Sequence, residues 1–218
     1  MRKLVISYLF LTINVGLVSC QFQLSFKAGP NYSKIIGPSA RFIWDTGYKL
    51  GANTEIGISY KIPPRIKFKV GLAYDFQRFY LNGYYGDKFE SHHDDGVISA
   101  GYLVTLLEPH VILAESINLE LVTGMYFSHL LNAKLDGYRD NKPFNSNITD
   151  DFHGGDDGFL IGLGYYPVLN QNTQIIIDLI YSRSLQGLEL HSESIKNQSF
   201  RLCIGLLFSI HNQVLNSL

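Results

Sequence analysis

Alternation of apolar and polar side chains is the most regular feature of the chain, and it is most complete in residues 118–134. Odd-numbered positions there are mostly apolar, whereas the even-numbered positions include Glu120, Asn132 and Lys134. A period of two residues is typical of a β-strand. At about 3.4 Å per residue the segment would form a strand roughly 50 Å long, which is enough to cross a bilayer at a tilt.

The same alternation recurs in seven other segments, which begin near Phe22, Leu50, Ile66, Val97, Phe159, Gln174 and Phe200. An even number of long, alternating strands is typical of the antiparallel barrels of the bacterial outer membrane. We therefore predict an all-β fold, an eight-stranded antiparallel up-and-down transmembrane β-barrel.

The expected connections between these strands alternate strictly between long and short. Outer-membrane barrels have this asymmetry, with tight turns on the periplasmic side and long loops facing outward. The pattern therefore predicts long extracellular loops and short periplasmic turns. The long connections are residues 35–46, 82–96, 136–158 and 187–197, and the short turns lie near Pro63, Glu115 and Asn170.

The first 20 residues differ from the rest of the chain. Arg2 and Lys3 precede an apolar run that ends in small residues at Cys20. This is the pattern of a secretory signal peptide, so we expect residues 1–20 to be removed and residues 21–218 to form the barrel domain. The ending Leu-Val-Ser-Cys also resembles a lipoprotein lipobox, which leaves open whether Cys20 is the last residue of the signal peptide or a lipidated first residue.

Charged residues within the strands share the face opposite to the apolar one. Side chains just fill the lumen of an eight-stranded barrel, and charges buried there need partners. Hairpin register places Glu55 nearly opposite Lys69 and Asp178 nearly opposite Arg201. Closure of the barrel would then bring Lys27 beside Arg201. The predicted lumenal charge network consists of Lys27, Glu55, Lys69, Glu120, Asp178 and Arg201.

Two acidic runs, residues 92–95 and the glycine-containing 150–158, could bind a cation, because clustered carboxylates suit calcium. Their spacing matches no calcium-binding repeat, so solvated surface loops are the preferred interpretation. The weak metal candidates are Asp94, Asp95, Asp156 and Asp157.

Composition bears on the class of partner. The net charge of −1 indicates no nucleic-acid partner, whereas 14 Tyr and 14 Phe residues suit a barrel surrounded by outer-membrane lipid. No nucleophile elbow, phosphate loop or zinc motif occurs in the sequence, so we expect no enzyme activity and no cofactor. Five tyrosines are expected to face outward at the membrane interfaces: Tyr60, Tyr74, Tyr102, Tyr165 and Tyr181.

Five stretches of the chain carry a family resemblance: FKAGPNYSKI, LELVTGMYFSHLLNAK, DGFLIGLGYYPVL, DLIYSRSLQGL and NQSFRLCIGLLF. They resemble the outer-membrane β-barrel proteins of Bacteroidetes that carry the PorT family label. The resemblance implies a barrel in the outer membrane. Because the protein after which the family is named is tied to protein secretion, the resemblance also implies a part in that process. None of the five stretches is a catalytic motif, so the resemblance implies no functional residue.

Three functions remain open. The preferred one is a structural or interaction barrel without an open pore, which acts through its extracellular loops. The second is an accessory component of protein secretion, whose partners would be other envelope or secretion proteins. The third is a soluble, lipocalin-like barrel that binds a ligand.

Overall fold

The computed structural model describes residues 21–36, 43–62, 65–86, 91–153, 155–186, 188–190 and 193–210. The expected signal peptide and the Pro63 turn lie outside these residues. Among the described residues, no helix is both long and apolar enough to cross a membrane.

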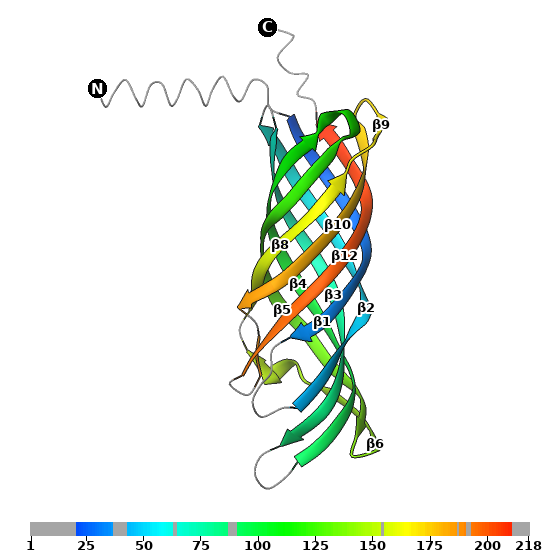
Figure 1. The fold of residues 1–218 in the computed structure, drawn as a ribbon, viewed down its shortest axis with the longest axis vertical. Helices are drawn as coiled ribbons and strands as arrows, with labels where there is room; N and C mark the ends of the chain where they lie inside the picture. Colours follow the sequence, from blue (N-terminus) through cyan, green and yellow to red (C-terminus); the bar gives the residue numbers. More distant parts are fainter. Residues whose placement is uncertain are drawn as a thin grey trace, which may run out of the picture.

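Eight long strands form the wall of a closed barrel (Figure 1). Each pairs antiparallel with the next along the chain, and the last pairs with the first. This arrangement confirms the predicted fold class. The strands are β1 (Gln21–Ile36), β2 (Ile43–Ile62), β3 (Ile66–Gly86), β4 (Ser91–Ala114), β5 (Leu119–Arg139), β8 (Asp156–Tyr165), β10 (Thr173–Gln186) and β12 (Glu193–Ile210).

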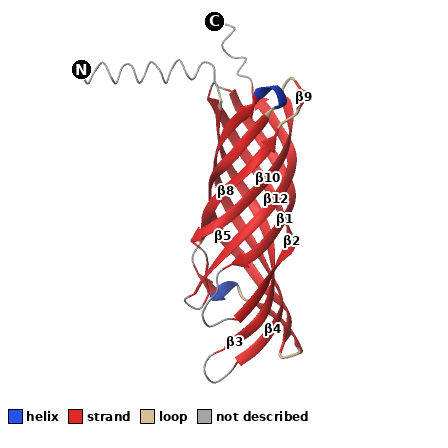
Figure 2. Ribbon diagram, viewed as in Figure 1, coloured by secondary structure: helices blue, strands red, loops and turns tan. Residues whose placement is uncertain are grey.

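Short elements lie at both ends of the barrel. Figure 2 shows the two 3-10 helices, η1 (Glu115–Ile117) and η2 (Thr149–Asp151), at opposite ends. The short strands are β6 (Lys142–Asn147), β7 (Phe152–His153), β9 (Val168–Asn170) and β11 (Leu188–Leu190). The end with η1 and β9 carries the tight turns, and we refer to it as the periplasmic end.

The strands are strongly staggered around the barrel. A row of register partners starts at Gln21 and returns to β1 at Asn31, ten residues further along the same strand. A stagger of this kind requires strands tilted by about 35–45° to the barrel axis. Residues at the same depth in the lumen are therefore not register partners. The row runs through Lys61, Lys67, His110, Val122, Gly162, Ile180 and Arg201.

The two faces of the wall have the reverse polarity of a soluble protein. On β3, the outward side chains of Phe68 and Val70 are 50% and 56% exposed, whereas Lys67 and Lys69 between them are 3% and 5% exposed. An exposed apolar wall around a polar interior is typical of a barrel whose outer solvent is lipid. The soluble, lipocalin-like alternative is therefore wrong.

Strands extend well beyond the apolar wall at the end opposite to η1. Pairing of β3 with β4 continues as far as Gly86 and Ser91, and β5 turns back into β6 at Asp140 and Asn141, whose φ angles are 50° and 63°. The expectation of long irregular loops at 82–96 and 136–158 is thus wrong for most of their length. Polar residues predominate in the sequence of these segments, so the regular apolar–polar alternation that marks a half-buried strand is lost.

A β-bulge changes the facing of residues late in β5. Gly101 pairs with Asn132, whereas the next residue, Tyr102, pairs with Leu130, so β5 carries one extra residue at this point. Ala133, which simple alternation places on the outer face, is fully buried as a result. An extra residue shifts every later side chain to the opposite face.

Candidate functional site

The lumen holds a layer of alternating charges halfway along the wall. Lys27 Nζ lies 2.9 Å from Asp178 Oδ2 and 3.1 Å from Glu55 Oε2. Lys69 Nζ contacts Glu55 and lies 2.7 Å from Glu108 Oε2. All five side chains are buried, so each charge depends on the others for compensation. We call Lys27, Glu55, Lys69, Glu108 and Asp178 the central charge layer.

A second group of charges lies nearer the periplasmic end. Glu120 Oε2 accepts hydrogen bonds from Lys67 Nζ, at 2.6 Å, and from His110 Nδ1, at 2.9 Å. The Lys67 ammonium also lies 4.1 Å from the centre of the Tyr166 ring. His110 Nε2 lies 3.5 Å from Glu108 Oε2, so the imidazole joins this group to the central charge layer.

The structure brings together five of the six residues of the predicted network. Lys27, Glu55, Lys69 and Asp178 belong to the central charge layer, and Glu120 belongs to the periplasmic group. Arg201 is buried but forms no ion pair with any described residue.

The expected pairing of Arg201 is wrong. The register partner of Asp178 is Cys203, and Asp178 forms a salt bridge with Lys27. The register partner of Arg201 is Ile180. Lys27 lies opposite Gly205 on β12, four residues from Arg201. On its other side Arg201 lies opposite Asn31 of β1, whose side-chain amide donates to Asp75.

The register about the Pro63 turn also differs from the expectation. Glu55 lies opposite Ala73, and Lys69 lies opposite Ser59. The Glu55–Lys69 contact nevertheless forms, because strand tilt lifts Glu55 and Lys69 to similar depths. Reasoning from a flat hairpin therefore found the contact between these residues but not their register.

Sequence reasoning missed Glu108, His110 and Lys67 as members of the network. Glu108 and His110 flank Pro109, and β4 continues through this proline. The even-numbered residues of β4 face inward on both sides of Pro109. Extending that alternation through Pro109 would have placed both side chains in the lumen.

Towards the extracellular end the lumen is lined by a cluster of buried apolar side chains, including Phe79 and Ile98, and by hydrogen-bonded polar groups rather than by ion pairs. Asp156 Oδ2 accepts Asn197 Nδ2 at 2.7 Å, and the Tyr126 and Ser184 hydroxyls lie 3.2 Å apart. Ser182 Oγ lies 2.8 Å from Ser199 Oγ. These groups and the charge layers occupy the middle of the lumen, and a cavity of about 320 Å³ remains at the periplasmic end beside Lys67 and Glu120.

The four weak metal candidates do not converge. Asp94 forms a two-pronged salt bridge with Arg139, and Asp95 accepts the Tyr80 hydroxyl at 3.0 Å. Asp156 is buried in the lumen and Asp157, next along β8, faces the other way. All four lie in strands, so the interpretation as surface loops is wrong.

The two acidic runs are also far apart. Asp94 and Asp156 have register partners on β5 that are 11 residues apart, Arg139 and Ser128, which corresponds to roughly 35 Å along the strand. Among the described residues, no group of three or more His, Cys, Asp or Glu side chains could hold a metal ion.

Aromatic side chains form a continuous outward row near the extracellular end of the apolar wall. Centroid distances are 5.1 Å for Tyr181–Phe200, 6.2 Å for Phe200–Tyr48 and 4.9 Å for Tyr48–Tyr32. Rows of this kind are typical of the membrane interface.

The tyrosines expected at the interfaces divide into two groups. The ring centroid of Tyr60 lies 5.4 Å from that of Phe22 at the opposite end of the barrel. Tyr74 and Tyr165 are each 43% exposed on the outer wall. Tyr102 is 2% exposed and points into the lumen, where its hydroxyl lies 3.4 Å from Asn197 Nδ2. The outward assignment of Tyr102 is therefore wrong.

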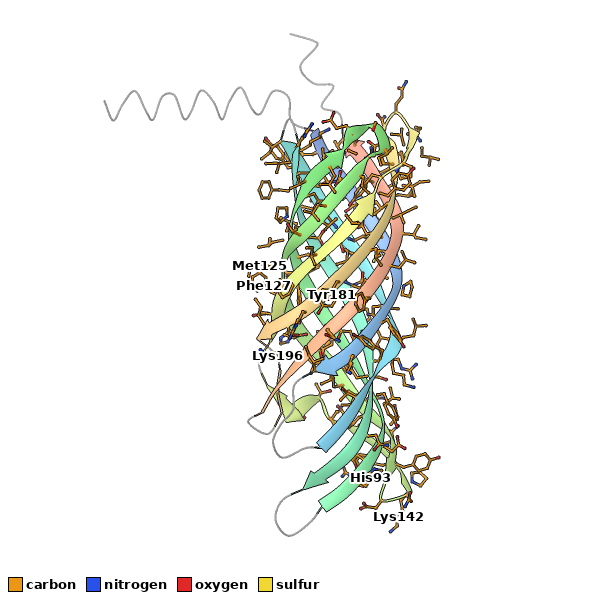
Figure 3. All side chains as sticks on the ribbon, viewed as in Figure 1. His93, Met125, Phe127, Lys142, Tyr181 and Lys196 are labelled. Atoms are coloured by element: carbon orange, nitrogen blue, oxygen red, sulfur yellow. The ribbon has the colours of Figure 1, made fainter. Side chains whose placement is uncertain are left out.

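Beyond the apolar wall, the ends of β2, β3, β4 and β5 continue with β6 as a sheet that projects from the barrel (Figure 1). Tyr138 is 57% exposed there, and the Arg139 guanidinium lies 4.0 Å from the centre of the Phe144 ring. Figure 3 shows His93 and Lys142 on this part of the molecule. We call it the projecting sheet.

Known proteins resemble the chain at the level of family and fold. Residues 19–189 match the family model described as outer membrane protein beta-barrel domain. No curated protein sequence matches the chain.

Several solved barrels are similar to the chain in fold alone. The attachment invasion locus protein Ail of Yersinia pestis is 16% identical, with 85% of this chain and 98% of Ail covered and a TM-score of 0.44. Neisserial surface protein A is 14% identical, with 87% of this chain and 97% of the neisserial protein covered and a TM-score of 0.43. OprG of Pseudomonas aeruginosa is 10% identical, with 87% of this chain and 96% of OprG covered and a TM-score of 0.45.

The match to the family model extends over most of the chain. The exposed apolar wall around a charged lumen is what residence in a bilayer requires. The chain thus belongs to the outer membrane protein beta-barrel domain family and is a protein of the cell outer membrane.

Proposed function

We propose that this barrel is a non-enzymatic interaction protein, closed to solutes, which engages another envelope or secreted protein through its projecting sheet. The observation that carries the proposal is the projecting sheet itself. It places exposed aromatic and basic side chains outside the membrane, at the end of a rigid wall.

The occupied middle of the lumen supports a role that does not depend on transport. Lys27, Lys69 and Glu108 point into the interior and meet carboxylate or ammonium groups from nearby strands. Opening a passage would separate buried charges from their partners, and such a separation costs about 3–5 kcal/mol for each broken pair.

The chemistry of the projecting sheet favours a protein partner. Tyr138 is an exposed aromatic side chain, and the exposed Lys142 supplies positive charge at the start of β6, while Arg139 is already paired with Asp94. Tyrosine and arginine are enriched in protein–protein interfaces, because they combine a large contact area with directed hydrogen bonds.

Site-specific photo-crosslinking in intact cells tests the proposal. A crosslinking amino acid at Tyr138 should capture a defined protein partner, whereas one at Ile117, which is 54% exposed at the periplasmic end, should not capture the same partner. Equal capture from both positions, or capture from neither, would contradict a role for the projecting sheet.

The secretion role implied by the PorT resemblance predicts a different result. If the barrel is an accessory of secretion, a deletion strain should lose a set of secreted proteins from the medium. We expect an unchanged profile, with secretion of the partner itself unaffected. Loss of several unrelated secreted proteins would favour the accessory role.

A further inference from the structure

The outer wall formed by β12, β1 and β2 has an apolar hollow of about 770 Å³. Its floor is shallow because Ala28 and Thr54 are small outward residues, while bulkier side chains stand around them. An open, apolar depression of this kind on a membrane-facing wall suits a hydrocarbon chain. The surrounding side chains are Phe26, Ile56, Ile204, Leu206 and Phe208.

Two lysines lie on β1 and β12 of the same wall, closer to the extracellular end. Lys34 lies opposite Gln198, and Lys196 lies opposite Ile36, so Lys34 and Lys196 are diagonal neighbours on the outer face. Diagonal neighbours of this kind are about 7–8 Å apart at their Cα atoms, which is within reach of two lysine side chains converging on one anion. Figure 3 shows Lys196 near the extracellular end of β12.

Aromatic rings and an amide complete this group. The Lys34 ammonium lies 5.8 Å from the centre of the Tyr48 ring, which stacks on Tyr32. Gln198 Nε2 donates to the Tyr48 hydroxyl. No ion pair with a carboxylate engages Lys34 or Lys196 within the described part of the chain. We call Lys34, Lys196, Tyr48 and Gln198 the rim cluster.

The distance between the hollow and the rim cluster matches the depth of one membrane leaflet. Ala28 and Lys34 are six residues apart on β1, or about 20 Å along the strand. At a tilt near 45° this becomes roughly 14 Å along the membrane normal. One leaflet contributes about half of a hydrocarbon core of about 30 Å. A lipid whose head group contacts the rim cluster would therefore lay an acyl chain in the hollow.

We propose that the β12–β1–β2 wall binds one phosphate-bearing lipid of the outer leaflet. Lys34 and Lys196 hold a head-group phosphate, Tyr48 and Tyr32 lie against the head-group and backbone region, and the hollow at Ala28 and Thr54 receives an acyl chain. A lysine ammonium binds phosphate as a point charge with three hydrogen-bond donors. The long aliphatic part of the side chain lies along the apolar wall while the ammonium reaches the head group.

Binding of diphosphoryl lipid A to the folded, purified barrel in detergent tests the proposal, with native mass spectrometry as the measurement. The wild type should retain one lipid. A basic residue near an anionic surface contributes about 1 kcal/mol, so Lys34→Gln with Lys196→Gln should weaken binding roughly 30-fold. Thr54→Phe, which fills the hollow, should weaken binding without any change in charge.

Matched variants distinguish this site from a general attraction. Lys134→Gln removes an exposed lysine from β5, and Thr105→Phe adds the same bulk to the outer face of β4. Both should bind lipid as the wild type does. Slower migration of each variant after boiling shows that the barrel was folded before the measurement.

Four results would overturn the proposal. They are equal binding of a phosphate-free lipid A, full competition by inorganic phosphate alone, loss of binding in Lys134→Gln to the same extent as in the double variant, and unchanged binding in Thr54→Phe. The first two would remove the phosphate-bearing lipid as the ligand, and the last two would remove the site.

Discussion

Lys27 on β1 lies 2.9 Å from Asp178 on β10, although β12 separates these two strands in the wall. The salt bridge therefore passes over the inner face of β12 and does not join a hydrogen-bonded strand pair. Lys27 also contacts Glu55 on the other side, so a single ammonium holds carboxylates from two different strands. Contacts of this kind tie the wall together from inside.

The Lys27–Asp178 pair should show strong coupling in a double-mutant cycle. Lys27→Met leaves Asp178 and Glu55 buried without their shared cation, so we expect a loss of about 3–5 kcal/mol in the free energy of unfolding. Lys27→Met with Asp178→Leu should lose less than the sum of the single variants. Urea unfolding in detergent measures all three values.

Arg201 and Asp178 provide the control for that cycle. The two side chains form no ion pair, so Arg201→Met and Asp178→Leu should have nearly additive effects. Strong coupling between Arg201 and Asp178, with none between Lys27 and Asp178, would contradict the arrangement of the lumen.

Closure of the barrel between β1 and β12 should depend on Gly205. A Cβ atom at this position would collide with the carbonyl oxygen of Phe26 on β1. Gly205→Val should therefore weaken the closing strand pair, with loss of the fast-migrating unboiled band in electrophoresis. The comparison variant Gly47→Ala, whose Cβ would have the flexible Tyr80 side chain as its nearest neighbour at 3.3 Å, should keep that band.

The salt bridge between Asp94 and Arg139 should contribute little to stability. The Arg139 side chain is 32% exposed on the projecting sheet, where water and salt screen the interaction. Asp94→Asn should change the free energy of unfolding by less than about 1 kcal/mol. Glu108→Gln, in the central charge layer, should lose several times more. A larger loss for Asp94→Asn would mean that the projecting sheet is part of the stable barrel.

The purified barrel should form no general diffusion pore. Interlocked side chains such as Lys69 and Glu108, whose atoms approach to 2.7 Å, occupy the middle of the lumen. Planar-bilayer recordings should show no large stepwise conductance from the monomer. Regular porin-like steps, absent from a mock purification, would disprove a closed lumen.

Periodicity in the sequence was sufficient to predict the architecture. A side chain in a strand can face only inward or outward, so the alternation around Lys67, Phe68, Lys69 and Val70 states which face is buried. The same rule placed Lys27, Glu55 and Asp178 in the lumen. It failed where its assumption of one residue per step fails, as at the bulge before Ala133, and where polar residues predominate, as in the projecting sheet.

What the sequence by itself determined is therefore the barrel, its strand number and the inward set of charges. Only the tertiary structure decided which charges meet. The stagger of ten residues around the closed wall tilts every strand, so depth in the lumen depends on the whole ring of registers and not on any one hairpin. This global constraint pairs Lys27 with Asp178 and places Ile180 opposite Arg201, and no local pattern in the chain encodes it.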